Sequence, residues 1–115
     1  MQKKILKNRY YNFLGIAKRA GKIVAGHAIV VENISSAALV ILADNASERT
    51  KRKIIKICQE QQKELVCYGK SEDYAQALGS KAPVVLAILD KSFSNALMNK
   101  FGFGVLFGGE RIGES

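Results

Sequence analysis

The stretch "AKRAGKIVAGHAIVVENI", residues 17–34, contains the two turns that decide the fold. A helix-like segment ends at Gly21, "KIV" (22–24) is a short β-type run, and Gly26 precedes a second segment rich in apolar residues. Glycine freely takes the left-handed backbone conformation that closes a helix, and it permits a sharp turn from a strand into a helix. The stretch therefore predicts the end of one helix, a strand over 22–24 and a second helix over about 27–35.

Apolar residues before this stretch recur at helical spacing. They are Leu6, Tyr10, Phe13, Leu14 and Ala17. The offsets i, i+4, i+7, i+8 and i+11 place them on one side of a helix and leave the lysines on the other side. This pattern predicts an amphipathic helix over residues 3–20.

Strand-like and helix-like segments alternate through the rest of the chain. The run "ALVILA" (38–43) is apolar on both faces and predicts a central strand. Asn45 or Ser47 is expected to cap the next helix, which runs to about Gln62, and Asn45 with Glu48 fits a capping box. The remaining predicted elements are a strand at 64–69, a helix at 71–79, a strand at 83–89 and a helix from Asp90 or Ser92 to about Phe101.

This alternation predicts an α/β fold, a three-layer α/β/α sandwich around a small mixed, mostly parallel four-stranded sheet. The 115 residues are expected to form a single domain over 1–101, followed by a glycine-rich tail at 102–115 that is flexible or loosely docked. The apolar runs are too short for a membrane span, and the basic N-terminal segment lacks the apolar centre of a secretory signal. We therefore expect a cytoplasmic monomer with no membrane contact.

Positive charge is concentrated in two segments of the chain. The protein has 18 Lys and Arg against 10 Asp and Glu, a net charge of +8, and residues 1–31 hold seven basic residues and no acidic one. Such clustering is typical of proteins that bind a polyanion, although a basic solubilising face without a partner is the alternative. The second cluster consists of Arg49, Lys51, Arg52, Lys53 and Lys56.

Signals for an enzyme are weak, and we expect no catalytic residue, metal or cofactor. The sequence Gly69-Lys70-Ser71 resembles the end of a P-loop, but Glu64 stands where the first glycine of that motif is required. His27 is the single histidine and is expected to start a helix, so no Ser/His/Asp set can be assigned. Cys58 and Cys67 are expected to be reduced core thiols.

The chain has the groups that hold RNA phosphates: Lys and Arg side chains, and glycine turns at helix starts. The loops after the first two predicted strands and the loop "GSKAP" (79–83) are expected to meet at one sheet edge. Asp44 ends the central strand, where α/β sheets place ligands, or else it caps the next helix. We expect both basic clusters to form one phosphate-binding surface. The predicted RNA-binding residues are Lys18, Arg19, Lys22, Gly26, His27, Asp44, Lys51, Arg52 and Lys81.

Three segments of the chain resemble a known family: "LGIAKRAGKIVAGHAIVVENI" (14–34), "LVILADNASERTKRKI" (39–54) and "LGSKAPVVLAILDKSF" (78–93). They are similar to the YlxQ-like bacterial group of the ribosomal protein L-seven-Ae superfamily, over about residues 8–100. The resemblance implies an α/β/α sandwich that binds ribosomal or other structured RNA and associates with the ribosome or translation machinery. Members clamp the bent RNA motif called the kink-turn, and residues 80–83 correspond to the loop that shields the bend.

The match to the kink-turn binders is partial. Those proteins have Gly-x-Asn-Glu at the start of the second helix and a lysine one turn later. Gly26 matches the glycine, but Ala28, Ile29 and Glu32 stand at the other three positions. Asparagine and glutamate read guanine edges, so the resemblance implies RNA binding more firmly than kink-turn reading.

Two other functions remain open at the level of the sequence. One is a protein–protein adaptor of the translation or transcription machinery, with Ala28 and Ile29 as an apolar contact. The other is an accessory substrate-binding domain of an RNA-modifying enzyme.

Overall fold

The computed structural model describes residues 2–101, with side chains from residue 7 onward. The side chain of Leu6, expected on the apolar side of the first helix, and the tail at 102–115 lie outside what is described. Within residues 2–101, no helix is both long and apolar enough to cross a membrane. The helices are α1 (Gln2–Arg19), α2 (His27–Glu32), η1 (Ile34–Ser36, a 3₁₀ turn), α3 (Glu48–Glu60), α4 (Ser71–Leu78) and α5 (Lys91–Phe101). The strands are β1 (Ile23–Ala25), β2 (Leu39–Leu42), β3 (Leu65–Cys67) and β4 (Val85–Ile88).

The four strands form a mixed sheet in the order β1-β4-β2-β3. β4 runs antiparallel to both of its neighbours, and β2 and β3 are parallel. The predicted mixed sheet is therefore confirmed. The expectation of mostly parallel pairing is wrong, because β4 separates β1 from β2 although these two strands point the same way. β3 ends, and β4 begins, at the edge of the sheet where β2 ends, because α4 and the loop 79–84 return the chain to that edge. There the Ala43 N–H donates to the Val84 carbonyl at 2.8 Å, and β4 therefore runs antiparallel to β2.

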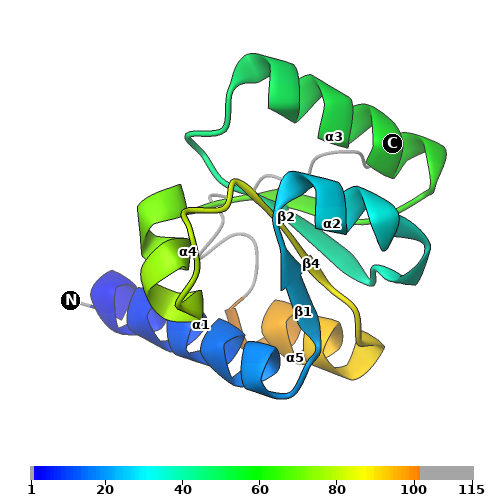
Figure 1. The fold of residues 1–115 in the computed structure, drawn as a ribbon. Coiled ribbons are helices and arrows are strands. Elements are labelled where there is room, and N and C mark those ends of the chain that lie inside the picture. Colours follow the sequence, from blue (N-terminus) through cyan, green and yellow to red (C-terminus); the bar gives the residue numbers. More distant parts are fainter. Residues whose placement is uncertain (1, 102–115) are drawn as a thin grey trace.

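Both faces of the sheet are covered, as the predicted sandwich requires. Figure 1 shows α1, α4 and α5 on one side and α2 and α3 on the other. Along β2, Leu39 and Ile41 pack into the first core, and Val40 and Leu42 into the second, since side chains alternate across a strand. All four are fully buried, which confirms β2 as a central strand.

The predicted first helix is confirmed within one residue at each end. Tyr10, Leu14 and Ala17 are fully buried. Gly21 closes the helix with φ at 72°, and its N–H donates to the Lys18 carbonyl at 2.9 Å. The Lys22 N–H donates to the Ala17 carbonyl at 2.9 Å, and the two bonds together form a Schellman motif.

Ser47 caps α3, so the predicted capping box at Asn45 is wrong, and so is the capping alternative for Asp44. The Ser47 hydroxyl oxygen accepts from the Thr50 N–H at 3.1 Å. Asn45 is instead held by α4, because its side-chain oxygen accepts from the Ser71 N–H at 3.0 Å. At the start of α5, the Asp90 carboxylate accepts a hydrogen bond from the Phe93 N–H at 3.0 Å, so Asp90 rather than Ser92 caps this helix.

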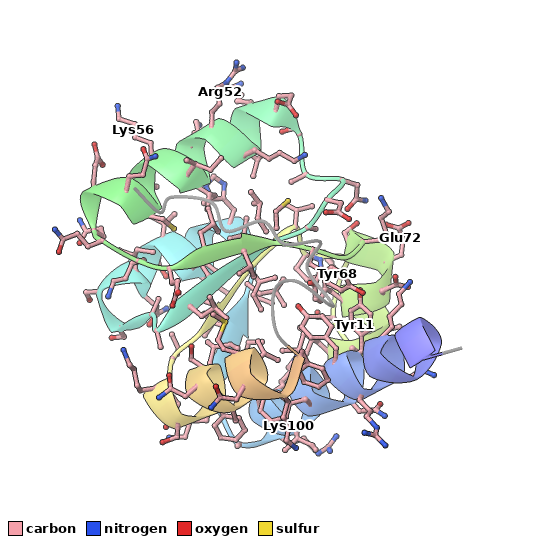
Figure 2. The ribbon with its side chains drawn as sticks, turned by 180° about the vertical axis from the view of Figure 1, so that it is seen from behind. Tyr11, Arg52, Lys56, Tyr68, Glu72 and Lys100 are labelled. Atoms are coloured by element: carbon pink, nitrogen blue, oxygen red, sulfur yellow. The ribbon has the colours of Figure 1, made fainter. Side chains whose placement is uncertain are left out.

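A cluster of four tyrosines fills the core beneath α1 and α4. The hydroxyls of Tyr10 and Tyr74 lie 2.7 Å apart, and Tyr74 donates to the Tyr68 carbonyl at 2.6 Å. Burial raises the pKa of both Tyr10 and Tyr74 well above its ordinary value, so both stay uncharged at neutral pH. Gly69, with φ at 83°, passes close to the hydroxyls of Tyr11 and Tyr74. Figure 2 shows Tyr11 and Tyr68 in this cluster.

Candidate nucleic-acid interface

Three loops meet where β1 and β2 end and β4 begins. The Gly26 N–H donates to the Val85 carbonyl at 2.9 Å, and the Ala43 N–H to Val84 at 2.8 Å. The Asp44 N–H extends this line to the Gly69 carbonyl at 2.7 Å. The expectation that these loops share one edge is confirmed, and we call it the strand-end edge: residues 26–29, 43–47 and 79–84.

Gly26 gives the strand-end edge an open stretch of backbone. Its φ and ψ are 118° and 143°, a conformation that side chains other than glycine rarely adopt. A Cβ built at this position would have no atom within 4 Å. The glycine is thus required by the backbone conformation, and the space beside it is free for a ligand to approach the main chain.

The first turn of α2 presents its side chains to solvent. His27, Ala28 and Ile29 are all exposed, and Ile29 keeps 46% of its surface accessible. Only Val30 in this helix is fully buried, where it packs into the core under α2 and α3. The positions that align with the family's base-reading pair therefore face solvent, but they carry apolar groups.

Charged residues lie on α3, which follows residues 43–47 in the chain, and in the loop 79–84. Lys51 is half-buried and forms an ion pair with Glu48 at 3.8 Å. Arg52 is exposed and projects outward from α3 (Figure 2). Lys81 is exposed in the loop, and Asp44 is exposed beside Cys67 at an S···O distance of 3.7 Å. Positive charge thus comes from two segments far apart in the sequence, and the carboxylates of Asp44 and Glu48 lie in the first of them.

Three predicted site residues lie elsewhere. Lys22 precedes β1, so it sits at the opposite end of that strand from Gly26; its carbonyl accepts from the Leu89 N–H at 2.8 Å. Its ammonium lies 3.6 Å from Asp90, whose pKa is held below its ordinary value by the Phe93 N–H and, secondarily, by Lys22.

The other two of these residues, Lys18 and Arg19, are in the last turn of α1, where Lys18 donates to the Leu78 carbonyl at 2.8 Å. The structure therefore separates Lys22 from Gly26, whereas the Lys18 ammonium lies beside the residue that precedes the loop 79–84. Lys22 and Gly26 are only four positions apart in the sequence, but they lie at opposite ends of β1.

Sequence reasoning missed the role of Asn45 in holding the edge together. Its amide nitrogen donates to the Ser71 hydroxyl at 2.9 Å and to the Glu72 carboxylate at 3.0 Å. The Glu72 carboxylate also accepts hydrogen bonds from the Glu72 N–H and from the Ser71 hydroxyl, and these bonds lower the pKa of Glu72. These bonds fix the loop that carries Asp44 to the start of α4. Since the partners are 26 residues apart, no local pattern could have indicated them.

Cys58 and Cys67 are reduced thiols, as expected. Cys58 is buried, and burial raises its pKa to about 11, so it remains protonated at neutral pH. Cys67 is only half-buried, at the strand-end edge rather than in the core. In the part of the chain that the structure describes, no three His, Cys, Asp or Glu side chains are grouped as a metal site would require.

The sequence matches the model of the ribosomal protein L7Ae/L30e/S12e/Gadd45 family over residues 8–98. It is 35% identical over 95 residues to the RNA-binding protein YlxQ of Bacillus subtilis (strain 168), which covers 78% of this chain and 92% of that protein. It is also 36% identical over 50 residues to the RNA-binding protein YlxQ of Enterococcus faecium, covering 42% and 48% of the two chains.

Two solved structures share the fold. A protein of unknown function from Bacillus halodurans C superposes with a TM-score of 0.74 and 29% identity, over 79% of this chain and 94% of that one. The Giardia lamblia 15.5kD RNA binding protein superposes with a TM-score of 0.68 and 18% identity, over 87% of each chain. At this lower identity the second match concerns the fold alone.

Proposed function

The chain belongs to the ribosomal protein L7Ae/L30e/S12e/Gadd45 family, and from this premise we propose that it is a non-enzymatic cytoplasmic RNA-binding protein. It holds structured RNA at the strand-end edge and works with the ribosome or the translation machinery. The observation that carries this proposal is the meeting of three loops at the strand-end edge: Gly26 leaves the backbone open, Lys81 is exposed in the loop 79–84, and residues 43–47 lead into α3 with its exposed Arg52. Relatives of this chain that are named RNA-binding proteins support it.

Each group at the strand-end edge suits one part of an RNA strand. The guanidinium of Arg52 and the ammonium groups of Lys51 and Lys81 hold phosphates. Gly26 lets the sugar-phosphate backbone approach the main chain, and His27 lies beside it at the start of α2. The Asp44 carboxylate accepts hydrogen bonds from ribose hydroxyls or base amino groups and rejects phosphates, which keeps the strand in one register.

We expect removal of single cations at the edge to weaken RNA binding through the salt-dependent part of the affinity. For Arg52→Ala and Lys51→Ala, the slope of log affinity against log salt should fall by roughly one unit or less, with little change in sequence preference, because each lost phosphate contact releases fewer counterions. Filter binding to a ribosomal RNA fragment across a salt series measures this. Lys22→Ala is the matched control and should leave the slope unchanged, since Lys22 lies at the other end of β1. Affinity that does not respond to salt would contradict the proposal.

Gly26→Val should abolish RNA binding while the helix content in circular dichroism stays nearly unchanged. Valine at this backbone conformation costs about 1–3 kcal/mol, and relief of that strain would move the turn that RNA approaches. The control is Gly21→Val, at the opposite end of β1, which has φ at 72° and equally open space. It should keep RNA binding.

Either of two results would count against this use of Gly26. Normal RNA binding by Gly26→Val would make the turn a connector only. Unfolding of Gly26→Val alone, with Gly21→Val folded, would make the glycine structural and remove its support for the site.

A protein–protein adaptor remains the second candidate because of one observation. Ile29 and Val31 on α2 keep 46% and 36% of their surface exposed. Large apolar side chains at such exposure suit an apolar partner better than a phosphate backbone. The triple variant Ala28→Asn, Ile29→Glu and Glu32→Lys separates the two candidates, because only an RNA-binding α2 should gain a kink-turn preference from it.

A further inference from the structure

A second positive region lies on the opposite side of the sheet from α3. In the sequence, α1 and α5 together hold eight Lys and Arg and no Asp or Glu. The two helices pack against each other through Phe13, whose ring centroid lies 5.6 Å from that of Phe93 and 6.2 Å from that of Phe101. The apolar sides of both helices are thus used internally, and their charged sides face solvent.

Four exposed residues of α1 form one continuous row. Arg9, Asn12, Ile16 and Arg19 follow each other at i, i+3, i+7 and i+10, and all four are exposed. Lys100 of α5 extends the row, because its ammonium lies 5.7 Å from the centre of the Phe13 ring between the two helices. We call this row the α1/α5 face.

The cations of the α1/α5 face are available for a ligand. Lys7 at its border is partly neutralised by Asp73 at 3.9 Å. Across residues 2–101, no carboxylate lies within ion-pair distance of Arg9, Arg19 or Lys100.

The α1/α5 face and the outward side of α3 lie on opposite sides of the molecule. In Figure 2, Arg52 and Lys56 project from α3 on one side of the molecule, and Lys100 lies on the other. The smallest extent of the molecule is 28 Å, which exceeds the screening length of about 8 Å at physiological salt. A phosphate held by α3 therefore neutralises nothing on the α1/α5 face.

The chemistry of the α1/α5 face favours a nucleic-acid duplex over a lipid surface. Helices that lie on membranes expose several large apolar side chains, and on the described part of this face only Ile16 is both large and exposed. The face carries two guanidinium groups, one ammonium group and the Asn12 amide, and all of these donate hydrogen bonds to phosphate and ribose oxygens. α1 has 18 residues and is about 27 Å long, enough to lie along several phosphates of one duplex.

We propose that the α1/α5 face is a second RNA-binding surface, which contacts the phosphate backbone of one duplex segment while the strand-end edge holds another. This inference builds on the proposed function, because the second segment belongs to the same class of RNA. The protein then links two helical segments of a structured RNA without reading bases on the α1/α5 face.

Stoichiometry of a short, perfectly paired RNA duplex tests the proposal. Native mass spectrometry counts the duplexes bound by the full chain, by the triple variant Arg9→Gln, Arg19→Gln and Lys100→Gln, and by a matched strand-end variant with Lys51→Gln, Arg52→Gln and Lys81→Gln. Each variant removes three positive charges, so their net charges are equal. Circular dichroism checks that both variants fold. We expect two duplexes on the unmodified chain, one on each triple variant and none on the combination of all six changes.

The other outcomes separate this inference from the proposed function. If the α1/α5 variant binds as many duplexes as the unmodified chain with equal affinity, the inference is overturned. If instead the strand-end variant still binds two duplexes and the α1/α5 variant loses one, the α1/α5 face stands and the strand-end edge fails. No duplex on any protein overturns both. Sedimentation with phosphatidylserine vesicles that depends on Arg9, Arg19 and Lys100, without an effect on duplex number, would identify a lipid surface as the partner and overturn the inference.

Discussion

Gly69→Ala should lower the free energy of unfolding by roughly 2–4 kcal/mol, the sum of a backbone cost and an overpacking cost. Gly69 has φ at 83°, where a Cβ is disfavoured. That Cβ would also lie 2.5 Å from the Tyr11 hydroxyl and 2.9 Å from the Tyr74 hydroxyl. Tyr74 cannot move aside, because its hydroxyl is bonded to Tyr10 and to the Tyr68 carbonyl. Urea unfolding measures the loss, and the melting temperature should fall by roughly 10–25 °C.

Two further variants separate the parts of this effect. Gly79→Ala is the control: its φ is 62° and no atom lies within 4 Å of the added Cβ, so it should cost only about 1 kcal/mol. Tyr11→Phe removes a buried hydroxyl that has no hydrogen-bond partner among the described residues, and combined with Gly69→Ala it should restore part of the stability. Equal losses for Gly69→Ala and Gly79→Ala would show that the tyrosine cluster yields without cost.

The second large effect concerns the RNA preference of α2. A carboxylate can accept hydrogen bonds from the N1–H and N2–H groups of guanine, and the Ile29 side chain has no acceptor for either. A base docked against Ile29 would leave these donors unsatisfied, at about 1–3 kcal/mol for each such group. Glu32 adds a negative charge where the family resemblance implies a lysine. We therefore expect the unmodified protein to bind a standard kink-turn weakly, with little preference over a duplex of equal length.

The triple change Ala28→Asn, Ile29→Glu and Glu32→Lys should give the protein a kink-turn preference of tenfold or more, if about 1.4 kcal/mol is regained. All three residues are exposed, so the variant is expected to fold. Competition binding at one fixed salt concentration compares the two proteins. The control variant, Val31→Lys, adds positive charge on the same helix without the reading pair and should raise affinity for both RNAs alike.

Two results would contradict this account of α2. Tight and selective kink-turn binding by the unmodified protein would mean that other residues read the RNA. A folded triple variant that gains nothing would mean that α2 does not dock on RNA, and the adaptor function would then be favoured.

Local patterns were sufficient to predict the elements but not their neighbours. The periodicity from Tyr10 to Ala17 and the glycine at 21 located α1, because helix spacing and helix closure depend on adjacent residues. The position of β4 between β1 and β2 depends on where the loop 79–84 returns, which no short-range signal encodes. The same limit explains the capping error, since Asn45 has its partner 26 residues away at Ser71.

The candidate site was predictable only in part, for a related reason. Gly26, Asp44 and Lys81 were correctly expected at one edge, because the ends of successive strands define that edge. Lys22 was assigned to the same surface from its closeness in sequence to Gly26. Three residues of strand lie between them, and because each strand residue advances the chain by about 3.3 Å, Lys22 and Gly26 lie at opposite ends of β1.

The position of β4 also sets when in synthesis the strand-end edge can exist. β1 pairs only with β4 in this sheet, and residues 85–88 are the last of the described strands to be made. A growing chain that has not yet produced Val85 lacks the carbonyl to which the Gly26 N–H is bonded, and β1 has no strand to pair with. Partly made chains therefore present scattered positive charge without a shaped surface, and the complete edge belongs to chains in which nearly the whole domain has already left the ribosome.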